Sequence, residues 1–176
     1  GGAGGTIGEA VVAKADADGY TILHDATAFS VNGSLYPNLS FDYRKDFDPV
    51  ILVSLVPNIL VVTPSVPVKT MADVIAFGKA APGGINMASS GNGTLQHLSL
   101  EMFRHQTGVK ISHVPYRGGG IALNDLMGGQ VNFFFANGSS VVGLIQGGQV
   151  KAIAHTGKGR LKSLPDIPPV SDTLPG

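Results

Sequence analysis

The 176-residue sequence contains no cysteine, and its charges cancel, with 12 Lys and Arg against 12 Asp and Glu. The absence of cysteine excludes disulfide bonds and thiolate metal sites. A net charge of +0 removes the electrostatic case for nucleic acid or an anionic membrane surface as a partner. Long apolar runs are also missing, because Ser54, Pro57 and Asn58 interrupt the longest one, around Ile51–Val62. We therefore expect no direct insertion of this chain into a membrane.

Glycine is abundant, with 25 residues, and hydrophobic residues make up 43% of the chain. This composition can fill the core of one ordinary domain or of two small ones. The apolar residues alternate between the helical and the extended period. Helices are expected over 6–15, 28–36, 71–81, 94–107, 121–127 and 139–146, and strands over 20–24, 85–88, 110–114, 131–135 and 150–155. Such alternation is typical of an α/β fold whose mainly parallel sheet has helices on both faces.

One segment, Phe47–Thr63, departs from this alternation. It contains two β-branched apolar runs on either side of Pro57 and Asn58. A long extended segment with a break in its middle suits a strand that leaves one sheet and enters another. The alternative is that the two runs form adjacent strands of a single sheet.

The most informative polar stretch is Ile85–His97, which is expected to be a short strand, a turn and the start of a helix. Thr94 can cap that helix, so the free amides at its N-terminus and the helix dipole together form an anion site. Gly91 and Gly93 let a ligand approach the backbone closely. Hydrogen-bonding side chains in the turn are those of Ser89, Ser90, Asn92 and Thr94. We expect this turn to bind a carboxylate; the alternative is an ordinary strand-to-helix loop with a threonine cap.

Three loops follow parallel strands of the expected sheet, and they should therefore line one edge of it. These loops are Ser89–Thr94, Tyr116–Gly120 and Ala136–Ser140. Arg117 lies in the second of them, where its guanidinium can bind a carboxylate with two parallel hydrogen bonds. The alternative for Arg117 is a solvated surface side chain. Tyr116 could either cover a ligand or pack in the core.

A metal site is not expected. His97 and His105 lie about 12 Å apart along their helix, which is too far for them to share one ion. The remaining histidines lie on or beside expected strands and are expected to be structural: His24, His113 and His155.

An enzyme is the main alternative to a binding protein, as a small α/β hydrolase or transferase that uses Ser90 and His97. Ser90 does not lie in the G-x-S-x-G motif of such a nucleophile. No cofactor is expected, because no lysine precedes Thr94 as in a phosphate loop and the glycine spacing of Gly2–Gly8 departs from G-x-G-x-x-G.

Several long motifs resemble one family nearly end to end. They are GAGGTIG (2–8), DGYTIL (18–23), LYPNLSFDYRKDF (35–47), VPNILVVTPSVPVKT (56–70), ASSGNGTLQHL (88–98), VPYRGGGIALNDLMGGQV (114–131) and SLPDIPPV (163–170). The sequence is similar to the Bug/TctC solute receptors, the extracytoplasmic binding proteins of tripartite tricarboxylate transporters. This resemblance implies a two-lobe, type II periplasmic-binding-protein fold of the Venus-flytrap kind, without catalysis and without a cofactor.

The resemblance also implies an assignment of lobes, site and partners. Lobe 1 would comprise residues 1–57 and lobe 2 residues 58–176, with a hinge crossing near 54–63. The implied ligand-binding residues are Thr27, Ser89, Ser90, Gly91, Asn92, Gly93, Thr94, His97, Tyr116, Arg117, Gly118 and Asn137. The implied partners are a small carboxylate and the membrane subunits of a transporter, and the implied localisation is periplasmic, although the residues present show no secretory signal.

The sequence departs from the family pattern in two ways. The opening strand of the family, its return crossing and the rest of lobe 1 have no counterpart here, so lobe 1 should be incomplete. We therefore predict exposed apolar surface on Tyr20–His24 and Val50–Val56, or partner contacts there. Many members also have Asp-Asn where this chain has Ala136-Asn137. An acidic residue there could pair with a ligand ammonium, so its absence favours a carboxylate without an amine.

Overall fold

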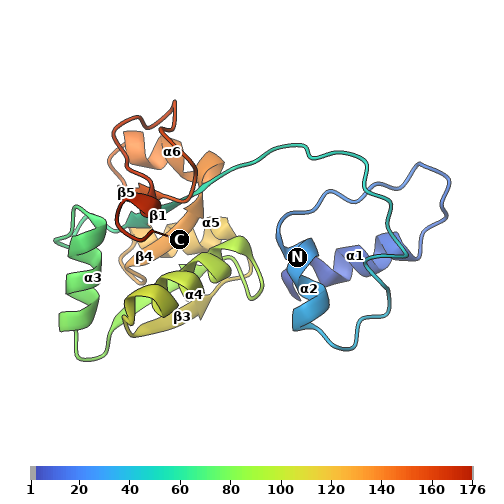
Figure 1. The fold of residues 1–176 in the computed structure, drawn as a ribbon, viewed down its shortest axis with the longest axis horizontal. Coiled ribbons are helices and arrows are strands. Elements are labelled where there is room, and N and C mark those ends of the chain that lie inside the picture. The colour runs from blue at the N-terminus through green and yellow to red at the C-terminus, as the bar shows by residue number, and fades with distance from the viewer. Residues whose placement is uncertain (1–2, 176) are drawn as a thin grey trace.

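The computed structural model describes residues 3–175, so Gly1 and Gly2 of the first glycine motif lie outside the described residues. The chain forms a small N-terminal unit and a larger C-terminal unit, joined by an extended segment (Figure 1). The small unit contains η1 (Ala3–Gly5), α1 (Thr6–Ala13) and α2 (Ala28–Leu35). The larger unit contains β1 (Asn58–Val62), α3 (Met71–Ala80), β2 (Ile85–Ser89), α4 (Leu95–Thr107), β3 (Ile111–Pro115), α5 (Gly119–Met127), β4 (Phe133–Asn137), α6 (Gly138–Gln146), β5 (Lys151–His155) and η2 (Val170–Asp172).

The larger unit is built on one five-stranded sheet with the strand order β3-β2-β4-β1-β5. Strand β2 runs parallel to β3 and β4, whereas β1 runs antiparallel to both β4 and β5. Four strands therefore share one direction, which confirms the predicted mainly parallel sheet. Their carboxyl ends lie at the same edge, and β1 begins at that edge because Asn58 pairs with Asn137.

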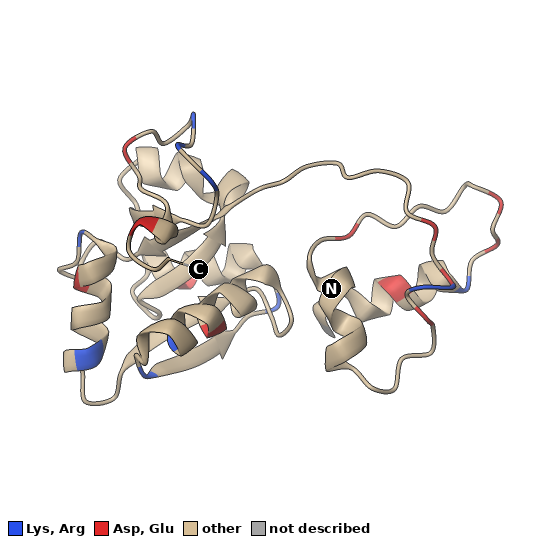
Figure 2. Cartoon of the chain, in the orientation of Figure 1, with Lys and Arg blue, Asp and Glu red and all other residues tan. Residues whose placement is uncertain are grey.

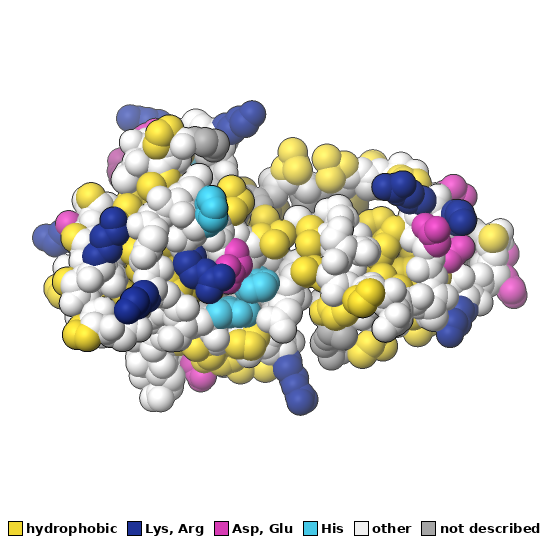
Figure 3. Space-filling view, turned by 60° about the horizontal axis from the view of Figure 1, so that its bottom comes forward, with side chains coloured by type: hydrophobic (Ala, Val, Ile, Leu, Met, Phe, Trp, Pro, Cys, Tyr) yellow, Lys and Arg dark blue, Asp and Glu magenta, His cyan; other side chains and the backbone are white. Residues whose placement is uncertain are grey.

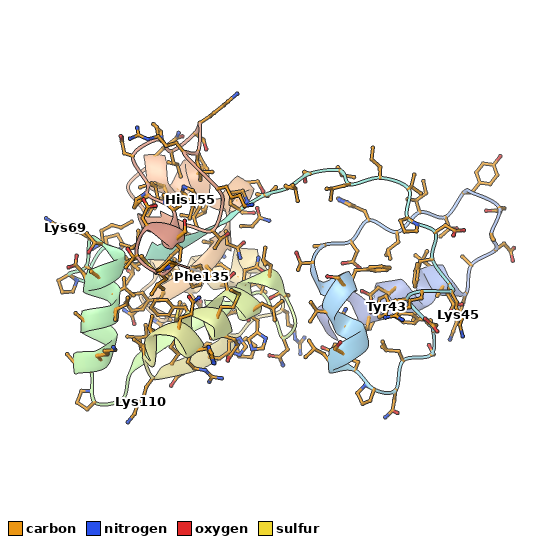
Figure 4. The ribbon with its side chains drawn as sticks, viewed as in Figure 1. Tyr43, Lys45, Lys69, Lys110, Phe135 and His155 are labelled. Atoms are coloured by element: carbon orange, nitrogen blue, oxygen red, sulfur yellow. The ribbon has the colours of Figure 1, made fainter. Side chains whose placement is uncertain are left out.

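Helices cover both faces of this sheet, as predicted, and each face has its own apolar core. On one face, Met71 of α3 and Leu100 and Phe103 of α4 pack with Phe133 and Phe135 of β4. On the other face, residues of α5 and α6 pack with Phe134, which points the opposite way from its two neighbours. Phe135 lies between the sheet and α4 in Figure 4. Within residues 3–175, no helix has the length and apolar character needed to cross a bilayer.

Local sequence signals account for the helix ends in the larger unit. Thr70 and Asp73 form a reciprocal capping box at the start of α3. Thr94 caps α4, and Gly108 ends it in the left-handed conformation, with φ 68°. Met102 is 60% exposed, whereas Leu100 is buried, because the sheet lies under the face that contains Leu100.

The small unit has a core of aromatic rings around a buried polar network. Phe29 packs edge-on against Tyr43, with ring centroids 4.7 Å apart, and Phe41 and Phe47 complete the cluster. Tyr43 points into this unit in Figure 4 and donates its hydroxyl hydrogen bond to the buried carboxyl of Glu9. Burial raises the pKa of Glu9, and the nearby Asp25 raises it further, against the lowering effect of its hydrogen bonds with Tyr43 and Asn32.

Two predicted extended segments do not form strands. Residues 20–24 were expected to be a strand but have no ladder partner, and residues 47–57 enter a sheet only at Asn58. A strand requires a neighbour to satisfy its backbone groups, and the small unit presents none to either segment. The predicted exposed apolar surface is confirmed, since Tyr20 is 92% exposed and Val50 and Leu55 are each 84% exposed.

Candidate functional site

The carboxyl edge of the sheet brings three helix N-termini together. Helices α4, α5 and α6 each follow one of the parallel strands β2, β3 and β4 along the chain, so their N-termini lie on the same side of the larger unit. The positive end of a helix dipole lies at each N-terminus, although in α6 the amides of Gly138 and Ser139 already have partners. This edge lies beside the small unit (Figure 1), and Figure 2 shows that few acidic or basic residues occur where the two units face each other. The arrangement favours an anion without a concentration of basic side chains.

The loop Ser89–Thr94, which the sequence analysis singled out, is held by its own hydrogen bonds. The fully buried Ser89 accepts a hydrogen bond at Oγ from the amide of Gly91, at 3.1 Å. The Gly91 carbonyl accepts one from Thr94 Oγ1, at 2.7 Å, and Thr94 Oγ1 in turn accepts one from the amide of His97, at 3.4 Å. These groups therefore shape the loop, and the amides of Gly91 and His97 already have partners.

His97 connects the loop to helix α4. Its Nδ1 accepts a hydrogen bond from the amide of Gly93, at 3.2 Å, so this nitrogen carries no proton in the observed arrangement. Its Nε2 faces Glu101 Oε1, at 3.6 Å. Among residues 3–175, His97 makes no hydrogen bond with Ser90, so the pair that the hydrolase alternative requires is not assembled.

His113 is a residue of this site that the sequence analysis missed. It lies on β3, its Nε2 is 2.6 Å from Ser89 Oγ, and its ring stacks on that of His97 with centroids 4.3 Å apart and planes at 17°. Burial lowers the pKa of His113, and the neighbouring His97 lowers it further. The predicted mainly parallel sheet was the only available signal, and it does not specify that β2 and β3 are neighbours.

Several predicted site residues keep free hydrogen-bonding groups. The amides of Leu95 and Gln96, in the first turn of α4, donate to no residue in the described part of the chain. The Arg117 guanidinium is exposed, and within residues 3–175 it forms no ion pair. Gly118 precedes α5 without any side-chain cap, which leaves the first turn of that helix open. The side chains of Ser90 and Asn92 also have no hydrogen bond to a described residue.

Two other predicted residues have side chains that are already partnered. The Tyr116 hydroxyl donates to Asp125 Oδ2 of α5, at 2.8 Å, and its ring packs against the core on that face. Asn137 caps α6, because its Oδ1 accepts hydrogen bonds from the amide and the hydroxyl of Ser139. Tyr116 can still contact a ligand through the exposed part of its ring, and Asn137 through its amide Nδ2.

The small unit contacts the larger one at this loop. A β-carbon on Gly93 would lie 2.8 Å from Leu35 Cδ1 and 3.3 Å from Asn32 Oδ1 of α2, and one on Gly4 would lie 3.1 Å from the Asn92 carbonyl. Buried Asn32 donates from Nδ2 to Gly4 and Glu9, whereas its Oδ1 has no donor among the described residues. The contact is thus made by the backbone of Gly4, Asn92 and Gly93 and by side chains of α2.

Thr27, the predicted contact from the small unit, is exposed at the start of α2. Its carbonyl accepts a hydrogen bond from Ser30 Oγ, and it has no recorded hydrogen bond to the larger unit within residues 3–175. The neighbouring Asp25 carboxylate lies within the small unit, 3.4 Å from where a β-carbon on Gly5 would lie.

Residues 3–175 contain no group of three or more His, Asp or Glu side chains placed to hold a metal ion. A hollow of about 430 Å³ is lined by the C-terminal loop between Gly159 and Asp172 rather than by any predicted site residue. Figure 3 shows a cluster of histidine, acidic and basic side chains on the larger unit, close to where the two units meet.

The fold is that of the periplasmic solute-binding proteins, whose solved members share this α/β architecture. Residues 1–174 match the model of the tripartite tricarboxylate transporter family receptor, and the chain belongs to that family. It is 35% identical to Protein BugT of Bordetella pertussis, over 97% of this chain and 53% of BugT. The chain spans about half the length of the curated relatives it matches.

Two solved structures with bound ligands are similar to this chain. R. palustris Rpa4515 with adipate is 36% identical, with a TM-score of 0.92, over 98% of this chain and 58% of that protein. MatC from Rhodopseudomonas palustris with bound malate is 29% identical, with a TM-score of 0.86, over 99% of this chain and 60% of MatC. Both bound ligands are small carboxylates without an amine.

Proposed function

We propose that this chain forms most of the ligand cleft of a periplasmic receptor that captures a small organic carboxylate for a tripartite tricarboxylate-type transporter. The observation that carries this proposal is the junction itself, where the N-termini of α4, α5 and α6 and the unpaired Arg117 lie together at one sheet edge beside the small unit. Adipate and malate in two similar structures support a carboxylate as the ligand class.

In this proposal the cleft lies between lobe 1, residues 1–57, and lobe 2, residues 58–176, with the crossing at 54–63. One carboxylate would bind to the amides of Leu95 and Gln96 and to the Arg117 guanidinium, since charge-assisted hydrogen bonds are the stronger ones. Contacts to both lobes at once would favour the closed form. The membrane subunits of the transporter would then recognise that form.

The receptor would be non-catalytic. Ser89, whose Oγ is next to an imidazole, is fully buried and contributes to the loop rather than facing a substrate. A nucleophile must be reachable by the atom it attacks.

The ligand is expected to lack an amine. Ala136 is fully buried in the core against α5 and α6, so this position offers no carboxylate for a ligand ammonium. An ammonium group brought into the cleft would lose solvation without gaining a partner.

The test is a thermal-shift comparison of adipate, malate, succinate, citrate, aspartate and phosphate. A ligand that binds only the native chain raises its melting temperature, by an amount that increases with concentration. Selective stabilisation by carboxylates without an amine is expected. Equal stabilisation by succinate and aspartate would contradict the expected preference, and the absence of a shift with every carboxylate would overturn the receptor proposal for this chain.

A further inference from the structure

The stacked pair of His97 and His113 is hydrogen-bonded to the proposed carboxylate loop. His113 extends from β3, the outermost strand of the sheet, and His97 extends from the first turn of α4. Both rings contact the loop through hydrogen bonds, His97 to the amide of Gly93 and His113 to the hydroxyl of Ser89. Any change of charge on this pair therefore acts on the loop at two points.

The hydrogen bonds restrict where protons can be. Nδ1 of His97 is an acceptor, so the neutral ring carries its proton on Nε2, which faces Glu101 at 3.6 Å. A second proton on Nδ1 would turn an acceptor into a donor, and the amide of Gly93 would lose its partner. His113, in contrast, can exchange donor and acceptor roles with Ser89, whose hydroxyl has a second acceptor in the Gly91 carbonyl, at 3.3 Å.

The charged groups around the pair come from one element. Glu101 and Arg104 of α4 form an ion pair with each other, and Glu101 also faces His97. Arg104 and His97 lower the pKa of His113, whereas Glu101 raises it, and the burial of His113 is the largest cause of its lowered pKa. The neighbouring strand β2 contributes only the neutral hydroxyl of Ser89. In the free chain the pair therefore has one acidic neighbour and one basic one.

We propose that binding of a carboxylate to this loop is coupled to the uptake of one proton by His97, with His113 remaining neutral. Besides the amides of Leu95 and Gln96, the bound carboxylate would accept a hydrogen bond from the released amide of Gly93 and another from the new Nδ1–H of His97, so it replaces the bond that protonation breaks. The proton comes from solvent, and Glu101 faces the other side of the imidazolium. Two stacked imidazolium rings 4.3 Å apart would repel, so the pair takes up one proton rather than two.

The inference rests on the proposed function, and calorimetry distinguishes a failure of the inference alone from a failure of both. Adipate is titrated into the whole chain at about pH 7 in two buffers with different ionisation enthalpies, where carboxylates are fully ionised. The difference in binding heat gives the number of protons taken up. Uptake approaching one proton, and an affinity that rises by up to about tenfold per unit decrease in pH, are expected. If no carboxylate gives binding heat, the proposed function and the inference both fail; if adipate binds without proton uptake, only the inference fails.

Two variants locate the proton. His97→Gln should abolish the uptake, whereas His105→Gln, on an exposed position of the same helix, should keep it. Uptake that persists in His97→Gln overturns the assignment. If His97→Gln fails to fold or to bind, NMR of the unmodified chain gives a direct measurement. Its imidazole C–H resonances are followed as a function of pH with and without saturating adipate. One histidine should titrate at higher pH in the presence of adipate, and unchanged titration of every histidine overturns the inference.

Discussion

Gly93 of the larger unit lies against Leu35 of the small unit, so closely that a β-carbon on Gly93 would be 2.8 Å from Leu35 Cδ1. Gly93 also has φ 78°, a conformation that side chains with a β-carbon disfavour. The candidate loop and the helix that faces it can therefore approach each other this closely because residue 93 has no side chain. Gly93 thus allows both the left-handed backbone of the loop and the contact with Leu35.

We predict that Gly93→Ala weakens adipate binding and destabilises the chain by about 1–2 kcal/mol, the cost of left-handed backbone at a residue with a β-carbon. The matched control is Gly108→Ala, because Gly108 has φ 68° but no atom within 4 Å of its added β-carbon. Both variants should lose thermal stability, Gly93→Ala at least as much as Gly108→Ala because of its contact with Leu35, and only Gly93→Ala should lose affinity in calorimetry. Equal affinity of the two variants would show that the contact with Leu35 has no role in binding.

Arg117 is the next position to test, since its guanidinium is exposed and forms no ion pair within residues 3–175. A hydrogen bond between an arginine and a ligand carboxylate at a partly exposed site should contribute about tenfold in affinity. Arg117→Gln is therefore expected to bind adipate about tenfold more weakly, with an unchanged melting temperature. Arg160→Gln, also exposed on the larger unit, serves as the control and should bind normally. Normal adipate affinity in Arg117→Gln would exclude a direct role for this side chain.

Glu9 should make the small unit less stable as pH rises. The raised pKa of Glu9 means that the native chain binds more protons than the unfolded chain above the ordinary carboxyl value of 4.5. The free energy of unfolding then decreases as pH rises through 4.5 and above it, by linkage. Glu9→Gln removes this dependence, so the variant should gain stability relative to the unmodified chain between about pH 4 and pH 7.

Urea unfolding followed by tyrosine fluorescence measures this effect, because Tyr20, Tyr36 and Tyr43 all lie in the small unit. Asp16→Asn, at an exposed carboxylate of the same unit, is the control and should leave the pH dependence unchanged. A Glu9→Gln variant whose stability changes with pH as in the unmodified chain would contradict the assignment.

Limited proteolysis should distinguish the two units. Tyr20, Leu52 and Leu55 are 92%, 72% and 84% exposed and lie in segments without strand partners, so chymotrypsin should cut there first. A fragment that begins near Asn58 and contains the complete five-stranded sheet should persist, as identified by mass spectrometry. Early cleavage inside residues 58–175 would contradict this order.

Much of the larger unit could be predicted because its signals are local. The capping box of Thr70 and Asp73 spans three residues, the Thr94 cap spans three, and Gly108 ends α4 through its own backbone conformation. Hydrogen bonds of this length form within one turn and depend little on the rest of the chain. The alternation of helices and strands, and with it the edge where the candidate loops meet, followed from apolar periodicity.

Only the tertiary structure decided which groups at that edge are free. Ser89 and His113 are 24 residues apart, and Asp125 reaches Tyr116 across a loop and a helix turn, so neither contact has a local signal. Residues 20–24 have the composition of a strand, yet a strand exists only where another segment satisfies its backbone groups. The amino-acid sequence alone thus determined the order of elements in the larger unit, its helix ends and the family. The packing of the sheet determined the histidine pair, the partnered side chains and the apolar residues that remain exposed, because each depends on segments that meet only in the folded chain.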